Sequence, residues 1–437
     1  YQKGTNTINV ASTAYFTVGD TVVIKDDKLA VDVSPTSGSE NPIHIETNII
    51  AAISGTDITL MYPLAHNYEL AFRPKIIRTI PAENAGCIDS TCRYVSNSDG
   101  NSYHAFQFLY TKDCFLVNHK VLGNPVTGIG SRGHGVRFSD GAINCRADNI
   151  TVYRPGMYAA SQGYGLTFYS GARGNIASNM MFTGTRHSVL FFRGACNNRA
   201  ENITSADCRG TDIDFHGCEE TDNTVSGVTI IGGPSTTADI TIKAGIKLGN
   251  PTHRVGCTGN TIQNVQFVDY MSYAAHILAP SSHNYLMNFS GRSLYGCYYQ
   301  YLSTEPAFMG SDNHQMNWHM KDTSRLVYVL GGTGVYYSMV DSVIHNVSTE
   351  ISDNIKLNQS WAHNEPIISL QYCSYIDISN AVMKMYGYTN NEFAVIMDST
   401  TAIRMKDIFI ENSLSGFKMT YSTDCIITGV NNVTDGA

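Results

Sequence analysis

Charged side chains are scarce in this sequence: they make up 15% of its 437 residues, and the formal net charge is −8. So few basic groups argue against a nucleic acid partner, which would require a basic surface. Long apolar runs are absent as well. A membrane-spanning helix needs about 18 consecutive apolar residues, and because the sequence contains no such run, we expect no membrane span.

The start of the chain, YQKGTN, lacks the basic and then apolar pattern of a signal peptide. We therefore expect none, and we interpret the chain as a piece of a longer one. Its 11 cysteines form no CxxC pair and no zinc-like Cys/His cluster. Most lie in apolar runs, so we expect buried free thiols and folding in a reducing cytosol, although Cys87 and Cys92 are close enough in sequence to pair. No cofactor and no metal is predicted.

Glycine and tyrosine, by contrast, are abundant, with 38 and 26 residues, while proline is limited to 12. Short runs of β-branched and aromatic residues recur along the chain, and Asn, Asp, Gly and Ser separate them. Such runs between turn-forming residues are typical of strands. The composition therefore predicts an all-β protein.

Three consecutive windows of 23 residues align without gaps. They read LTFYSGARGNIASNMMFTGTRHS (166–188), VLFFRGACNNRAENITSADCRGT (189–211) and DIDFHGCEETDNTVSGVTIIGGP (212–234). Glycine occupies the sixth position of each, and Asn175 matches Asn198. This repeat length predicts a parallel β-helix, in which each coil buries its apolar positions against its neighbours. A sandwich or a propeller is the alternative, but a propeller needs repeats roughly twice as long.

The first 80 residues do not follow this repeat. They contain alternating runs such as TINVASTAYFTVGDTVVI and a loop rich in Ser, Pro and Gly. We predict a small N-terminal β cap over residues 1–80, since an open solenoid end needs an irregular terminal unit. Residues 81–437 are predicted to form the β-helix.

The stretch TDIDFHGCEE (211–220) places Asp212, Asp214 and His216 at alternate positions. Successive side chains of a strand point to opposite faces, so these three are expected on one face. The window alignment stacks Ile213 under Leu190 and Thr167, and Phe215 under Phe192 and Tyr169, and so predicts that the acids point out to water. The upstream run VRFSDG places Val136 and Phe138 in the columns of Asp212 and Asp214. If those columns were the core, two carboxylates would be buried at a cost of several kcal/mol. A register shift between coils would resolve the conflict.

Glycoside hydrolysis requires two carboxyl groups that flank the bond, about 5–5.5 Å apart for retention and about 6.5–9.5 Å for inversion. Residues i and i+2 of a strand are about 6.5–7 Å apart, so Asp212 and Asp214 fit either geometry, and Glu219 or Glu220 can replace one of them. Cations near one carboxylate separate the two pKa values, which produces one acid and one base.

From this pattern we predict a catalytic set and a substrate-binding set. The catalytic residues are Arg186, His187, Asp212, Asp214, His216 and Glu219. The substrate-binding residues are Phe191, Arg193, Asp207 and Lys247, with Lys247 placed one coil below Asp214. Two simpler interpretations stay open. Glu219, Glu220 and Asp222 can be turn residues that bond their own backbone, and Arg186 with His187 can be a structural ion pair.

The coils from 133 to 234, with RHS one coil before DxDxHG, resemble phage tailspike proteins of the pectate-lyase-like type. The resemblance extends over about 100–435 as a pattern, and only GTRHS…GA…N…DIDFHG has the character of a motif. It implies a right-handed parallel β-helix, a homotrimer on the virion, and binding or cleavage of a bacterial surface polysaccharide (capsule, O-antigen or exopolysaccharide). It also implies that Arg186, His187 and the Asp212–His216 stretch lie in the saccharide groove.

The resulting functional prediction is an endo-acting glycoside hydrolase that uses paired carboxylates. Three alternatives stay open: a metal-dependent polysaccharide lyase, a teichoic-acid phosphodiesterase on the same scaffold, and an adhesin that binds glycan without cleaving it. If the groove lies between subunits, carboxylates from distant coils, such as Glu305 or Asp312, can contribute to it.

Overall fold

The computed structural model describes most of the chain as two compact units. One contains residues 1–209 and 213–226, and the other contains 210–212 and 227–437. The described residues are 1–28, 44–93, 104–123, 133–155, 163–217, 219–232, 244–249, 256–278, 281–300, 310–321, 323, 326–330, 339–340, 342–351, 366–385, 393–411 and 416–433. Apart from one 3₁₀ turn, every regular element among them is a strand.

The N-terminal part of the first unit is a five-stranded antiparallel sheet, in the order β1-β4-β3-β2-β5. Its elements are β1 (Thr7–Asn9), β2 (Thr21–Lys25), β3 (Ile45–Ser54), β4 (Asp57–Leu60), the 3₁₀ helix η1 (Leu70–Phe72) and β5 (Lys75–Thr79). The apolar positions of these strands pack around Val22, Ile24 and Ile58, which are buried. We call this sheet the cap. The predicted boundary at residue 80 falls between β5 and the next strand.

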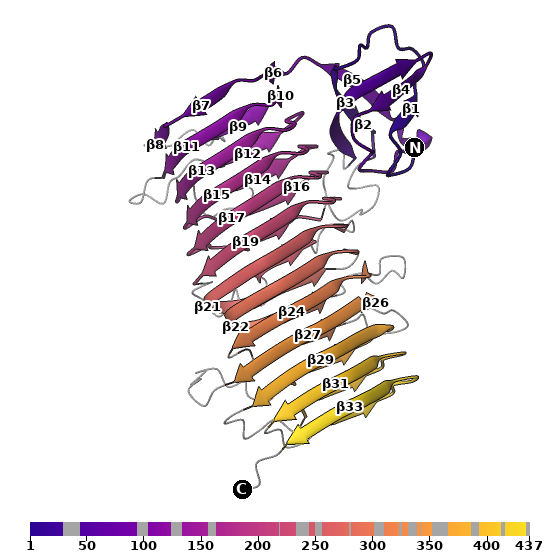
Figure 1. The fold of residues 1–437 in the computed structure, drawn as a ribbon, viewed down its shortest axis with the longest axis vertical. Helices are drawn as coiled ribbons and strands as arrows, with labels where there is room; N and C mark the ends of the chain where they lie inside the picture. Colours follow the sequence, from indigo (N-terminus) through magenta and orange to yellow (C-terminus); the bar gives the residue numbers. More distant parts are fainter. Residues whose placement is uncertain are drawn as a thin grey trace. The chain divides into compact units, whose positions relative to one another are not determined.

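The rest of the first unit is a parallel β-helix, in which a short strand and a long strand alternate along the chain (Figure 1). The short strands are β9 (Phe106–Leu109), β12 (Val136–Ser139), β14 (Leu166–Tyr169), β16 (Val189–Phe192) and β18 (Ile213–Phe215). The long strands are β11 (Phe115–Leu122), β13 (Arg146–Tyr153), β15 (Ile176–Thr183), β17 (Arg199–Ala206) and β19 (Thr224–Ile231). The coil before β9 contains β6 (Ala82–Glu83), β7 (Gly86–Ile88) and β8 (Thr91–Arg93), and β10 (Thr111–Lys112), between β9 and β11, pairs with β6.

Neighbouring short strands pair in parallel, and the prediction of a parallel β-helix is thereby confirmed over a sandwich or a propeller. One column of the core is a stack of phenylalanine rings, with one ring from each short strand. Successive centroids lie 4.5, 5.2, 4.9 and 4.5 Å apart, with planes nearly parallel. The column consists of Phe108, Phe138, Phe168, Phe191 and Phe215, all buried.

The matching asparagines of the repeat form a second column inside the coils. The Asn198 Oδ1 atom accepts hydrogen bonds from the backbone N–H (3.1 Å) and the side-chain Nδ2 (3.0 Å) of Asn175. Asn223 does the same for Asn198, at 3.0 and 3.1 Å. Because buried backbone groups need partners, this ladder explains why asparagine recurs at the turn between the short and the long strand.

The predicted register of β18 is wrong by one residue. Val189 pairs with Ile213, Leu190 with Asp214 and Phe191 with Phe215, whereas the window alignment had placed Ile213 beside Leu190 and Phe215 beside Phe192. Five residues separate β15 from β16, but six separate β17 from β18. The additional turn residue shifts the whole strand, so the core columns of VRFSDG continue into Ile213 and Phe215.

The cap packs on the coils through their turns. The Gly171 carbonyl accepts hydrogen bonds from the backbone N–H (3.2 Å) and hydroxyl (3.0 Å) of Thr47. Gly171 has φ +73°, and a Cβ atom there would lie 2.9 Å from the Ile45 carbonyl oxygen, so this approach requires glycine. Beside it, the buried Arg173 guanidinium donates to the Glu46 carboxylate and, at 2.6 Å, to the Pro63 carbonyl.

The second unit is built from the same kind of coil. Its strands are β20 (Ala244–Leu248), β21 (Thr261–Leu278), β22 (Tyr285–Gln300), β23 (Gly310–Ser311), β24 (His314–Lys321), β25 (Val327–Leu330), β26 (Met339–Val340), β27 (Ser342–Ile351), β28 (Ile368–Gln371), β29 (Ile376–Met385), β30 (Val395–Asp398), β31 (Arg404–Glu411), β32 (Phe417–Thr420) and β33 (Ile426–Val433). Equivalent strands of successive coils pair in parallel, and Asn260, Asn284 and Asn313 form another asparagine ladder.

The cysteines in the described parts of the chain are free thiols, and most are buried, as predicted. Cys87 and Cys92 form no disulfide with each other, and both are partly buried. Within those same parts, no helix has the length and apolar character that crossing a membrane requires.

Candidate functional site

A column of imidazole and phenol rings precedes the short strands. His104, His134, Tyr164 and His187 each lie two residues before β9, β12, β14 and β16, respectively. Their ring centroids are 4.6, 4.9 and 5.2 Å apart in succession. Because the coils stack in register, one sequence position per coil produces a continuous row of polar rings.

Asp214 lies between two histidines at the end of this row. Its Oδ2 atom is 3.0 Å from Nδ1 of His216 and 3.6 Å from Nε2 of His187. Asp214 is 0% exposed, whereas the His216 side chain retains 21% of its exposure. The buried carboxylate therefore orients both imidazoles. Of Asp214, His187 and His216, the last has the most exposed side chain.

Arg186 directly precedes His187 in the turn between β15 and β16. Its Nη1 donates a 3.1 Å hydrogen bond to the Tyr164 hydroxyl, and its guanidinium lies 5.5 Å from the centre of that ring. His187 and His216 therefore both lie beside Asp214, and Arg186 adjoins His187 in the chain. The contact of Arg186 with Tyr164 was not indicated by the sequence.

The histidines farther up the column are held neutral. Burial, reinforced by the positive charge of Arg137, lowers the pKa of His104 to about 4. Burial also lowers the pKa of His134 well below its usual value, and the neighbouring His104 and Arg137 act in the same direction. Around neutral pH these two rings therefore pack and hydrogen-bond without charge.

The expectation that both aspartates point into water is wrong. Asp212 is 1% exposed and Asp214 is 0% exposed. Asp214 does lie on the strand face opposite the phenylalanine column, since Ile213 and Phe215 point into the core. It is nevertheless covered, so its carboxylate has no direct access to solvent, whereas the His216 ring beside it does.

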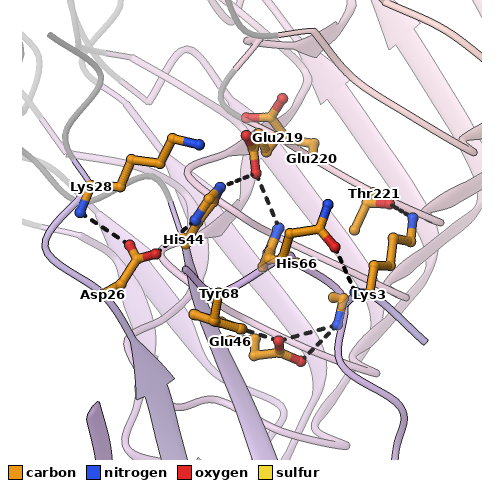
Figure 2. A network of polar contacts seen from close by, with 12 residues as sticks. Lys3, Asp26, Lys28, His44, Glu46, His66, Tyr68, Glu219, Glu220 and Thr221 are labelled. Atoms are coloured by element: carbon orange, nitrogen blue, oxygen red, sulfur yellow. Dashed lines mark hydrogen bonds and ion pairs between the residues drawn. The ribbon is translucent and has the colours of Figure 1, made fainter. Parts of the chain in front are cut away.

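Glu219 is separated from this cluster and faces the cap. Its Oε2 atom is 2.6 Å from Nε2 of His44 and 3.5 Å from Nδ1 of His66. The other nitrogen of His44, Nδ1, lies 2.9 Å from Oδ2 of the buried Asp26. Figure 2 shows both cap histidines directed at Glu219, with Asp26 behind His44. Glu219 therefore joins the coil to the cap and does not accompany Asp214.

The hydrogen bonds of this network stabilise the charged forms of both His44 and Glu219. Burial alone would lower the pKa of His44, but its hydrogen bonds to Asp26 and Glu219 outweigh burial and raise that pKa to about 9. Burial alone would raise the pKa of Glu219, yet the hydrogen bonds and charges of His44 and His66 hold it far below its ordinary range. At neutral pH a protonated His44 is consequently held between two carboxylates.

The other predicted residues have separate positions. Glu220 is buried and accepts hydrogen bonds from the backbone N–H groups of Arg193 (3.1 Å) and Gly217 (2.9 Å), which is the turn role considered above. Asp207, with φ 52°, lies in the turn after β17. Phe191 was predicted to bind substrate, but its ring is fully buried in the phenylalanine column. The guanidinium of the half-buried Arg193 lies 5.0 Å from the centres of the Tyr169 and Phe192 rings.

Two predictions concern the second unit. Lys247 lies in β20, where it pairs with His276 of β21. Asp312 lies beside two histidines, 2.7 Å from Nε2 of His314 and 3.6 Å from that of His283. Glu305 lies outside the described residues. Among the described parts of the chain, no group of three or more His, Cys, Asp or Glu side chains is arranged to hold a metal ion.

The residues that sequence reasoning missed are His104, His134 and Tyr164. A signal for them is present: YHAFQF, GHGVRF, GYGLTF and RHSVLF each place an aromatic ring two residues before a short strand. Aligning the short strands alone, without fixing a 23-residue period, reveals this column. The cap residues Asp26, His44 and His66 have no comparable signal, because their contact with Glu219 depends on how the cap packs.

A scan against protein-family models gives no match, and a search of curated proteins gives none either. Among solved structures, the chain is similar to the tailspike gp49 of Pseudomonas phage LKA1, with 12% identity, a TM-score of 0.44, and 95% of this chain and 62% of that one covered. It is also similar to the tailspike gp61 of Pseudomonas phage phi297, with 12% identity, a TM-score of 0.47, and coverages of 95% and 61%.

A third similar structure is the catalytic domain of a GH87 alpha-1,3-glucanase, with 10% identity, a TM-score of 0.42, and coverages of 98% and 87%. The chain spans about three fifths of the length of the two tailspike structures. All three similarities concern the fold, a parallel β-helix.

Proposed function

We propose that this chain is the polysaccharide-cleaving part of a homotrimeric phage tailspike, which hydrolyses glycosidic bonds of a bacterial surface polysaccharide. The resemblance of its coil motif to tailspike proteins supports the substrate class and the location on the phage tail. The observation that carries the proposal is the placement of one buried carboxylate, Asp214, against two imidazoles, of which His216 reaches the surface.

The geometry supports proton transfer by histidine in place of direct attack by paired carboxylates. With Asp214 accepting the Nδ1 proton of His216, Nε2 of the same ring takes a proton from water. The water oxygen then bonds to the anomeric carbon while the glycosidic bond breaks. His187, in its imidazolium form beside the same carboxylate, returns a proton to the departing oxygen. Asp214 is thus a positioning residue, and His187 and His216 are the proton carriers.

The test uses the intact chain and a panel of purified capsules, O-antigens and exopolysaccharides. We expect new reducing ends without the absorbance of an unsaturated uronate. Asp214→Asn and His216→Gln should each reduce the rate about 10²–10⁴-fold, the range for loss of general acid–base catalysis, while circular dichroism stays unchanged. Asp407→Asn is the matched control, since Asn occupies the equivalent left-handed position in neighbouring coils.

Other outcomes separate the alternatives. Unsaturated products indicate a lyase, and EDTA-sensitive cleavage indicates a metal-dependent enzyme. Tight binding without products indicates an adhesin. Full activity in both the Asp214 and the His216 variants would remove these residues from the mechanism, whatever the products are.

A further inference from the structure

A cavity of about 490 Å³ lies in the first unit, between the cap and the edge of the coils. Strands β2 and β5 form one wall, with Val23, Lys25 and Ile77. The turns that follow the short strands form the other wall. A pocket of this size is within the range of small-molecule sites and accommodates one or two sugar rings. None of the proposed catalytic residues lines it.

The coil wall is produced by one repeated position. Tyr110, Asp140, Ser170 and Arg193 each follow directly after β9, β12, β14 or β16, and each has a positive φ between 41° and 53°. Because the strands pair in register, these four turn residues form a row. The row offers two hydroxyl groups, a carboxylate and a guanidinium, all on one edge facing the cap.

The charges in the pocket favour an anion. Lys25 contributes an ammonium group and Arg193 a guanidinium, against the single carboxylate of Asp140. A third cation, the Arg137 guanidinium, lies 4.1 Å from the centre of the Tyr169 ring, on which Arg193 also stacks. Within the described residues, neither Lys25 nor Asp140 forms an ion pair within 4.0 Å. A net positive pocket in a chain of net charge −8 is a local exception.

We propose that this pocket binds a uronic acid residue of the polysaccharide. Its carboxylate pairs with Lys25 and Arg193, and its hydroxyl groups bond to Asp140 and Ser170. The apolar face of the sugar ring packs on Ile77 and Tyr110, which are 40% and 47% exposed. The assignment of the ligand as part of a polysaccharide rests on the proposed function.

The pocket is connected to the proposed catalytic centre through aromatic contacts. Arg193 lies 5.0 Å from the centre of the Phe192 ring, and that ring contacts His216 edge to face at 4.7 Å. One aromatic ring, Phe192, therefore separates Arg193 of the pocket from His216. In this proposal the pocket selects acidic polysaccharides and holds them in the neighbourhood of His216.

Binding is measured by calorimetry in the Asp214→Asn chain, so that no cleavage interferes. The probes are oligosaccharides of glucuronate and of galacturonate, with neutral glucose and galactose oligosaccharides of equal length. We expect at least one uronate probe to bind better than its neutral counterpart. Lys25→Gln should weaken that binding about tenfold or more and leave neutral binding unchanged, whereas Lys406→Gln, a variant of an exposed lysine in the second unit, should have no effect.

Equal affinity for acidic and neutral probes, or unchanged uronate binding in a folded Lys25→Gln chain, would overturn the proposal. The result is independent of the cleavage assay. Uronate binding that depends on Lys25 supports the pocket even if His216→Gln cleaves normally. Conversely, cleavage of a polysaccharide with an unchanged KM in Lys25→Gln removes the pocket and leaves the proposed activity in place.

Discussion

Asn198 is the residue that best shows how single side chains hold these coils together. It accepts two hydrogen bonds from Asn175 and donates two, to the Ala172 carbonyl at 2.8 Å and to Asn223 at 3.1 Å. All of these groups are buried. A buried amide or carbonyl that loses its partner costs about 1–3 kcal/mol. Each asparagine of the ladder therefore stabilises the folded state through its hydrogen bonds as well as through its packing.

We expect Asn198→Ala to lower the free energy of unfolding by about 2–4 kcal/mol, because it leaves the Asn175 N–H without its partner and removes one of the two hydrogen bonds that the Ala172 carbonyl accepts. Urea denaturation followed by circular dichroism measures the change. Asn431→Ala, at an exposed position of β33, should change stability by less than about 0.5 kcal/mol. Equal unfolding midpoints for the two variants would show that the ladder is not a source of stability.

At the same scale, the candidate site could be predicted only in part. The alternation in TDIDFH correctly separates Asp214 from Ile213 and Phe215, and RHS correctly brings His187 to the neighbouring coil. The additional turn residue before β18 keeps Ile213 and Phe215 in the core columns, and a slip of one residue would have reversed the faces of the strand. The burial of Asp214 on the opposite face could not be predicted, because alternation indicates the face of a side chain but not what covers that face.

Among the elements, the cap is joined to the coils by titratable groups. The raised pKa of His44, about 9 against an ordinary 6.5, means that the folded state binds this proton more tightly than the unfolded state does. The resulting stability is fully present below pH 6.5 and is lost as the pH rises through 9. Glu219 has a depressed pKa, so its contribution is present above its ordinary value of 4.5 and is lost as the pH falls below it.

We therefore expect the His44 contribution to be greatest at about pH 6 and small at about pH 10. By the conversion of about 1.4 kcal/mol for each pKa unit, it amounts to about 3 kcal/mol. Urea denaturation of the wild-type chain and His44→Gln at both pH values measures it as a difference in free energy of unfolding. A difference that does not shrink as the pH rises would show that the His44 ion pairs do not stabilise the cap.

The elements themselves were more predictable than their docking. Short apolar runs, turn glycines and matching asparagines predicted the strands and the parallel coils, because each coil repeats the same local solution. The contact of His44 with Glu219 joins residues far apart in sequence, and neither position is part of a repeat. The contact forms only because the cap packs on the turn after β18, and a repeat pattern in the sequence does not predict that packing.

For the molecule as a whole, the consequence of a solenoid is that each coil is stabilised by its immediate neighbours. The cap contributes through Arg173, whose guanidinium is bonded to Glu46 and Pro63 and lies 5.2 Å from the centre of the Tyr62 ring. Glu46 is fully buried and accepts further hydrogen bonds from Tyr68 and the Ala65 N–H. Removing Arg173 alone leaves this carboxylate without its counter-charge.

We expect Arg173→Met to destabilise the first unit by about 3–5 kcal/mol, the usual cost of removing one partner of a buried ion pair. The double variant Arg173→Met with Glu46→Gln should recover part of the loss, because the uncompensated charge is then gone. Hydrogen exchange followed by mass spectrometry locates the effect. Amides of β2, β3, β13 and β15 should exchange faster, while those of β29 and β31, many coils away along the chain, should keep wild-type rates. Uniformly faster exchange through β31 would contradict nearest-neighbour stabilisation, and unchanged exchange in β3 would show that the Glu46–Arg173 pair does not hold the cap.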